Sequence, residues 1–158
     1  MQMDGKQPMT FNEYVIVFAG QIYNIDILKA EILAHNLKLE TSSDTEILLK
    51  SYICFGSKVV NKLSGIFSFA IWNKKSKTLF MARDTLGIMP FYYCKINDTF
   101  IFSTDIKAIL SHPSILNNIS IITLPSNEEK YFNKTIFKNI YELSPSYSMT
   151  YKNRNIKV

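Results

Sequence analysis

The sequence predicts an α+β fold in which strands and helices form layers. Two apolar runs, Ile66–Trp72 and Thr78–Ala82, flank the polar segment 73–77 and are rich in aromatic and β-branched residues. This pattern is typical of a β-hairpin. In the first run both sets of alternating positions are apolar, so this strand needs cover on both faces and belongs inside a layered domain. Helical apolar spacing and a capping sequence elsewhere in the chain predict the α component.

The first part of the chain predicts a loop, a strand and a helix. Residues 1–12 are polar and predict a loop. Tyr14–Phe18 predicts a strand, and the Ala19-Gly20-Gln21 segment that follows predicts a tight turn. A helix is expected over residues 24–36, because apolar residues recur there on one helical face, at Ile25, Leu28 and Ile32.

A second helix is predicted over Asp44–Phe55. Ser43 and Glu46 form a capping box, in which the Ser43 hydroxyl and the Glu46 carboxylate each accept a free backbone N–H at the helix start. Gly56 is expected to end this helix.

The remaining elements are expected as short helices and hairpins. We expect a short helix that carries Val59, Val60 and Leu63, and then a hairpin of Phe91–Lys95 with Thr99–Ser103. A helix over Asp105–Leu110 is expected to end before Pro113. The last expected elements are a helical turn at Asn127–Phe132 and a hairpin of Ser146–Tyr151 with Ile156–Val158. The 158 residues predict one domain, with a loop over 1–12, a main body over 14–113 and a C-terminal region over 114–158 that leads toward a further domain.

Composition excludes several classes of function. The net charge is +5, but the basic residues are scattered and most dense in the predicted turn 73–77, so we expect solvated surface charge and no nucleic-acid site. No apolar run reaches the length of a membrane span, and the first residues lack a signal-peptide pattern. Cys54 and Cys94 predict reduced thiols in a cytoplasmic protein. His35 and His112 have no metal-ligand spacing, so no metal site is expected.

The segment Leu63–Tyr93 closely resembles the glutaminase domain of glutamine-hydrolysing asparagine synthetases, which are class II glutamine amidotransferases of the N-terminal-nucleophile hydrolase fold. Four more segments, Tyr14–Asn24, Thr41–Tyr52, Phe100–Leu110 and Thr135–Tyr151, follow in the family's order and spacing. The resemblance covers nearly the whole chain. It implies a sandwich of two antiparallel sheets with helices outside, incomplete at its N-terminal end.

The resemblance also implies site residues. In the family, the segment that corresponds to Ala19-Gly20-Gln21 carries an Asn amide and a Gly N–H that form the oxyanion hole, and then an acidic residue that helps to hold the substrate's α-amino group. Gly20 is retained here, whereas Ala19 has no side-chain donor and Gln21 has no charge. The alternative for Gly20 is that it only lets the chain turn.

Asp44 corresponds to the family aspartate that binds the glutamine α-amino group, although a carboxylate in the first turn of a helix is also explained by the helix dipole. Arg83 and Asp84 correspond to the family's Arg-Asp pair. We expect them to form an ion pair that orders the loop with Gly87 and Pro90, and not to be catalytic.

A catalytic nucleophile is not recognisable. The family reaction uses a cysteine at the mature N-terminus, whereas this chain begins Met1-Gln2. Cys54 and Cys94 have no cationic neighbour in sequence and are interpreted as packing residues. No ATP-binding loop is present, so ATP and Mg²⁺ would belong to a synthetase domain outside this chain.

The sequence therefore predicts a glutamine amidotransferase-like domain that is catalytically inactive as this chain and binds glutamine weakly if at all. Two alternatives stay open: a fragment of an active asparagine synthetase whose start lies upstream, and a non-catalytic subunit that pairs with a separate half. Because the family's first strand lies upstream of Met1, Tyr14–Phe18 is expected to present an open strand edge, and self-association or a complementing partner is expected.

Overall fold

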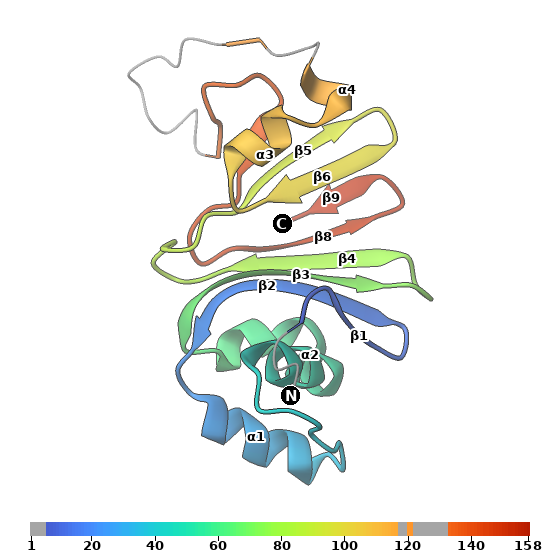
Figure 1. The fold of residues 1–158 in the computed structure, drawn as a ribbon, viewed down its shortest axis with the longest axis vertical. Helices are drawn as coiled ribbons and strands as arrows, with labels where there is room; N and C mark the ends of the chain where they lie inside the picture. The colour runs from blue at the N-terminus through green and yellow to red at the C-terminus, as the bar shows by residue number, and fades with distance from the viewer. Residues whose placement is uncertain (1–5, 117–119, 122–132) are drawn as a thin grey trace.

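The computed structural model describes residues 6–116, 120–121 and 133–158, and it has the predicted α+β architecture (Figure 1). Within these residues, six antiparallel strands form one sheet in the order β1-β2-β3-β4-β8-β9, and three form a second sheet in the order β6-β5-β7. The strands are β1 (Met9–Phe11), β2 (Tyr14–Ile22), β3 (Gly65–Asn73), β4 (Thr78–Arg83), β5 (Tyr92–Ile96), β6 (Thr99–Ser103), β7 (Ile140–Glu142), β8 (Ser148–Lys152) and β9 (Asn155–Lys157).

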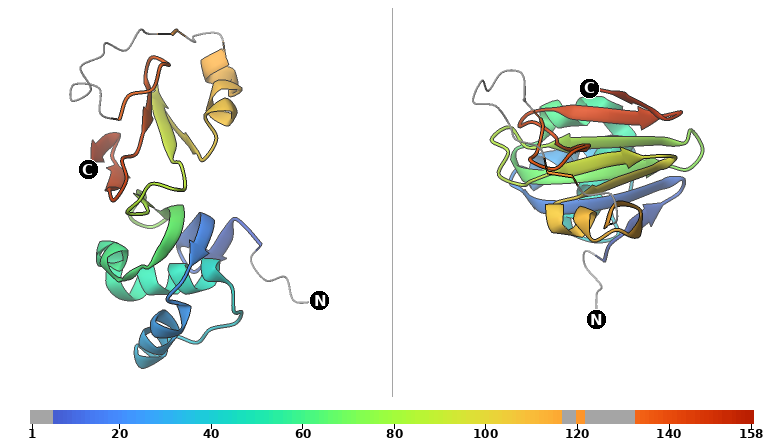
Figure 2. Two further views of the ribbon diagram at one scale, coloured as in Figure 1. Left: turned by 90° about the vertical axis from the view of Figure 1, so that its left-hand side faces the viewer. Right: turned by 90° about the horizontal axis from the view of Figure 1, so that it is seen from above.

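Helices cover the outer faces of the two sheets. Helices α1 (Ile25–Ala34) and α2 (Asp44–Phe55) and the 3-10 helix η1 (Gly56–Lys62) lie on the six-stranded sheet, and the short helices α3 (Ile106–Leu110) and α4 (Pro113–Leu116) lie beside the three-stranded sheet (Figures 1 and 2). The layer order is thus helix, sheet, sheet, helix.

The two-faced apolar strand β3 lies between two cores, as the sequence predicts. Phe67, Phe69 and Ile71 pack in the core under α1 and α2. Ala70 and the half-buried Trp72 lie on the opposite face and pack in a second core between the two sheets. Tyr93 of β5 contributes to this core from the other sheet. A third core lies between the three-stranded sheet and α3 and α4.

Two local predictions are wrong. Residues 1–12 are not entirely loop, since β1 pairs with the first residues of β2. The Ala19-Gly20-Gln21 segment is not a turn, since β2 continues through it in register with β3 up to Ile22. Helix α3 ends before Pro113, as predicted, and Pro113 begins the short helix α4.

The edge predicted to be open is covered instead. β2 lies between β1 and β3, so Tyr14–Phe18 presents no free strand edge. Hairpin and helix predictions elsewhere are confirmed to within a few residues, including Gly56 with a positive φ of 58° at the end of α2. The turn predicted at Asn127–Phe132 lies outside the described residues.

Candidate functional site

The candidate site lies along the end of β2, on the edge that faces away from β3. Beyond β1, two side chains take the place of a neighbouring strand on this edge. The Gln7 carboxamide accepts a hydrogen bond from the Phe18 N–H at 2.7 Å and donates one to the Phe18 carbonyl at 2.8 Å. The Asp44 Oδ2 atom accepts a hydrogen bond from the Ile22 N–H at 2.8 Å.

The Gly20 N–H faces the same edge between these two side chains. Backbone N–H groups of a strand alternate in direction, and those of Phe18 and Ile22 both point to this edge. Gly20 therefore presents its N–H between a carboxamide and a carboxylate. Its φ is +123°, and a Cβ atom here would lie 2.0 Å from the Ile66 carbonyl oxygen, so no other residue fits.

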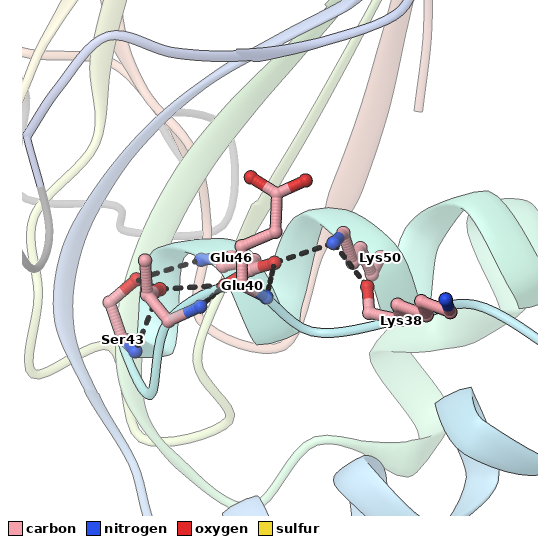
Figure 3. Close-up of polar contacts among 6 residues, drawn as sticks. Lys38, Glu40, Ser43, Glu46 and Lys50 are labelled. Carbon is pink, nitrogen blue, oxygen red and sulfur yellow. Dashed lines mark hydrogen bonds and ion pairs between the residues drawn. The ribbon is translucent and has the colours of Figure 1, made fainter.

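Asp44 is held in position by the start of α2. The Ser43 hydroxyl caps the helix by accepting a hydrogen bond from the Glu46 N–H at 3.3 Å, as predicted. The predicted reciprocal bond is wrong: the Glu46 carboxylate accepts from the N–H groups of Glu40 and Thr41, not from Ser43. The capping residues therefore tie the preceding loop to the helix (Figure 3).

The loop before α2 is further fixed by a buried ion pair. Lys50, which is 2% exposed, donates to Glu46 Oε1 at 2.5 Å and to the Lys38 carbonyl oxygen (Figure 3). Its ammonium also lies 4.7 Å from the centre of the Phe11 ring, which connects β1 to the same helix. Burial alone would raise the pKa of Glu46, but the hydrogen bonds from Lys50, Thr41 and Glu40 outweigh it and lower this pKa below its ordinary value.

A pocket of about 360 Å³ opens beside this edge, between the two sheets. Ala19 contributes a methyl group to it, and Ser68 lies directly opposite Ala19 on β3. The other lining residues are mostly apolar and include Phe91 and Phe102. Gln21 is exposed and is not among the residues that line this pocket.

Arg83 and Asp84 order the loop after β4, as predicted, but they do not pair with each other. The buried Asp84 carboxylate accepts hydrogen bonds from four N–H groups, those of Phe67, Leu86, Ile88 and Met89. Burial acts to raise the pKa of Asp84, and these hydrogen bonds lower it below its ordinary value. Arg83 forms its ion pair with Glu142 at 2.7 Å and donates to the Gly87 carbonyl oxygen.

The loop that contains Gly87 and Pro90 supports the site from the far side of β3. Gly87 has a φ of +66°, and a Cβ atom there would lie 2.6 Å from the Pro145 side chain. Asp84 connects the loop to β3 through the Phe67 N–H, and Phe67 lies opposite Gly20. The loop therefore supports the strand against which Gly20 lies.

The structure keeps both cysteines away from this edge. Cys94 is 2% exposed and lies in the core beside α3, and Cys54 is half-buried on α2. Burial raises the pKa of both thiols, and the nearby Glu31 carboxylate raises that of Cys54 further. In the described part of the chain, no cluster of His, Cys, Asp and Glu is arranged to hold a metal ion.

Sequence reasoning missed two residues of the site, Gln7 and Ser68. Gln7 lies in the segment that the sequence predicts as loop, and only the fold brings its carboxamide to β2, eleven residues away. Ser68 is the one polar residue in the apolar run Ile66–Trp72, a signal that was available in the sequence.

Comparison with known proteins identifies the family. The profile of a family described as a glutamine amidotransferase domain matches residues 1–158. The chain belongs to this family. The glutamine amidotransferase domain is 37% identical over 162 residues to asparagine synthetase [glutamine-hydrolyzing] 3 of Bacillus subtilis, an alignment that covers 98% of this chain and 26% of that protein. It is 40% identical over 109 residues to asparagine synthetase [glutamine-hydrolyzing] 1 of the same organism, covering 68% of this chain and 17% of that protein.

Solved structures show the same fold. A structure described as the allosteric regulatory enzyme of purine biosynthesis matches the domain with a TM-score of 0.68 at 18% identity, over 96% of this chain and 30% of that one. Glutamine phosphoribosylpyrophosphate amidotransferase from B. subtilis matches with a TM-score of 0.67, also at 18% identity. The glutamine amidotransferase domain thus has the N-terminal-nucleophile amidotransferase fold and is related to asparagine synthetases, but spans about a quarter of the length of the first of these relatives. Within the described residues, no helix is long and apolar enough to cross a membrane.

Proposed function

We propose that this chain is a glutamine-site domain of asparagine-synthetase lineage that binds glutamine weakly and does not hydrolyse it by itself. The observation that carries the proposal is that the strand edge keeps the Gly20 N–H, whereas the preceding residue, which lines the pocket, is an alanine without a side-chain donor. The family resemblance places a side-chain amide donor at residue 19. Loss of one oxyanion donor typically lowers the rate by about two to three orders of magnitude.

The available nucleophiles support the same proposal. Glutamine hydrolysis through a covalent intermediate needs a thiolate or an activated hydroxyl next to a base. Cys54 and Cys94 do not line the pocket, and their raised pKa values favour the neutral thiol. The hydroxyls that line it, those of Ser68, Ser103 and Thr104, have no histidine among the described lining residues.

Weak binding follows from the charges at the site. Asp44 Oδ2 already accepts the Ile22 N–H, which leaves Oδ1 without a hydrogen bond to any described residue and free for a ligand ammonium. One such partly exposed contact contributes about 1 kcal/mol or less. Gln21 adds no charge, and immobilising a small ligand costs several kcal/mol. We therefore expect a dissociation constant of about 1 mM or weaker.

The test is the release of glutamate from glutamine by the purified chain. We expect no turnover above that of a heat-inactivated control, in the wild type and in the Cys54→Ala/Cys94→Ala variant alike. Turnover that both chains share would contradict the proposal and would show a nucleophile other than these thiols. Turnover lost in either single cysteine variant would contradict the packing role of that cysteine.

The role of the whole protein is a separate proposal. Because the relatives are much longer than this chain, the domain is proposed to act with a synthetase part that binds ATP and Mg²⁺, in a longer enzyme or as a separately encoded half. Co-purification of the tagged chain with proteins of its own cell tests the second form. A partner that contains a synthetase domain would support it, and recovery of the chain alone would contradict it.

A further inference from the structure

The Ser68 hydroxyl is buried without a hydrogen-bond partner among the described residues. Ser68 as a whole is 2% exposed and lies in the middle of β3. A hydroxyl removed from water is nearly always hydrogen-bonded, because an unsatisfied polar group destabilises the folded state. The missing partner is therefore expected to come from a molecule that occupies the adjacent pocket.

The register of β2 and β3 places this hydroxyl at the site. Ser68 is paired with Ala19, and directly opposite residues of antiparallel strands lie on one face with Cβ atoms about 5 Å apart. Both residues line the pocket between the sheets, where Ala70 and Phe91 are among the apolar neighbours. The Ser68 hydroxyl thus lies beside the methyl group that occupies the place of the side-chain donor.

We propose that Ser68 is a ligand-binding residue that donates a hydrogen bond to the side-chain carboxamide oxygen of glutamine. In this arrangement, Asp44 holds the α-ammonium group at one end, and the Gly20 N–H and the Ser68 hydroxyl bind the carboxamide at the other. The inference rests on the proposed glutamine site and adds to it a specificity residue for the carboxamide. The Ser68 hydroxyl, on the neighbouring strand, thus supplies the hydrogen-bond donor that Ala19 lacks.

The test compares glutamine with norvaline, an amino acid of similar shape that keeps the α-ammonium group and lacks the carboxamide. Each is titrated into the ¹⁵N-labelled chain, and dissociation constants are obtained from the chemical shifts of backbone amides. One neutral hydrogen bond changes affinity by about tenfold. We expect the wild type to prefer glutamine to norvaline by at least this factor, because the Gly20 N–H also binds the carboxamide.

Ser68→Ala is expected to lower the affinity for glutamine about tenfold and to leave norvaline binding unchanged. Ser51→Ala is the matched control, because the Ser51 hydroxyl is also buried and unpartnered among the described residues but lies on α2. This control is expected to keep the preference of the wild type. Both variants remove an unsatisfied hydroxyl, so neither is expected to lower the Tm. Ala19→Asn in the Ser68→Ala background is expected to restore the preference for glutamine, since it returns a donor to the same face.

The outcomes separate the two proposals. A Ser68→Ala chain that keeps the full wild-type preference for glutamine, or a wild type that binds both ligands equally, would overturn the role of Ser68 and leave the Asp44 end of the site in place. A wild type that binds neither ligand would overturn the glutamine site itself and the role of Ser68 with it.

Discussion

Gly20 is, among the glycines that the structure describes, the one whose backbone least tolerates a side chain. Its φ of +123° is rare for L-residues, and a Cβ atom would collide with the Ile66 carbonyl group of the paired strand. Gly56 also has a positive φ, 58°, but no atom lies within 4 Å of the position of its Cβ. The two glycines therefore separate the effect of backbone conformation from that of a close contact.

We predict that Gly20→Ala destabilises the domain far more than Gly56→Ala. The first change adds a clash with the backbone of β3 to the conformational strain and is expected to cost more than about 3 kcal/mol. The second places an alanine at a φ of 58° and a ψ of −142°, near a region that is essentially restricted to glycine, at about 1–3 kcal/mol, and adds no clash. Urea unfolding followed by circular dichroism measures both. Equal losses would show that β3 moves away to accept the methyl group, which would contradict a rigid site edge.

At the scale of elements, α2 and the loop before it act as one unit that places Asp44. Glu46 is 4% exposed and accepts hydrogen bonds from both the loop and Lys50. Removal of one member of a buried pair leaves an uncompensated charge. The position of the site edge therefore depends on a charge pair that does not line the pocket.

We predict that Glu46→Gln lowers the free energy of unfolding by about 3–5 kcal/mol at pH 7, because it leaves the Lys50 ammonium buried without its partner. The folded state holds the pKa of Glu46 below its ordinary value of 4.5, so the carboxylate stabilises the fold above that pH. This stabilisation is lost as the pH falls through the lowered pKa. The difference between wild type and variant is therefore expected to shrink in acid, as followed by urea unfolding over a pH series.

The lowered pKa of Asp84 acts in the same direction, so both chains are expected to lose stability in acid. Asp98→Asn is the control, since the pair of Asp98 with Arg154 is exposed. It is expected to change the free energy of unfolding by less than about 1 kcal/mol. A difference between wild type and Glu46→Gln that stays constant down to pH 3 would exclude the charge of Glu46 as its source.

At the scale of the whole molecule, the open edge belongs to the three-stranded sheet. Among the described strands, β6 pairs with β5 alone and, at five residues, is longer than β1, β7 and β9, the other strands at the sheet edges. Next to β6, an apolar pocket of about 330 Å³ is lined by Val17, Trp72 and Phe100, among other residues. An unpaired strand beside an apolar surface favours association with another chain.

We predict that the isolated chain self-associates through this face. Light scattering coupled to size-exclusion chromatography is expected to show a mass that rises with concentration. Val17→Lys places a charge in the groove and is expected to give a monomer. Ile156→Lys places the same charge on β9, at an edge of the other sheet, and is expected to associate like the wild type. A wild type that stays monomeric, or an effect of Ile156→Lys alone, would contradict association at β6.

Local patterns in the sequence determined most of the elements of this protein. The hairpin of β3 and β4 follows from two apolar runs around a polar turn, and α2 follows from Ser43 at its start and Gly56 at its end. The order and spacing of five segments also determined the family. These signals are readable because each lies within a few residues of the structure that it specifies.

Only the tertiary structure decided which groups meet at the site. It placed the Gln7 carboxamide on β2, paired Arg83 with Glu142 in place of its neighbour Asp84, and covered the edge that the sequence predicted to be open. It also left the Ser68 hydroxyl without a described partner, opposite Ala19. The side-chain contacts join residues far apart in the chain, and the choice of partner depends on burial and geometry that no local pattern contains. The cover of the edge is a local hairpin of β1 with β2, but β1 lies in a polar segment that carries no strand pattern.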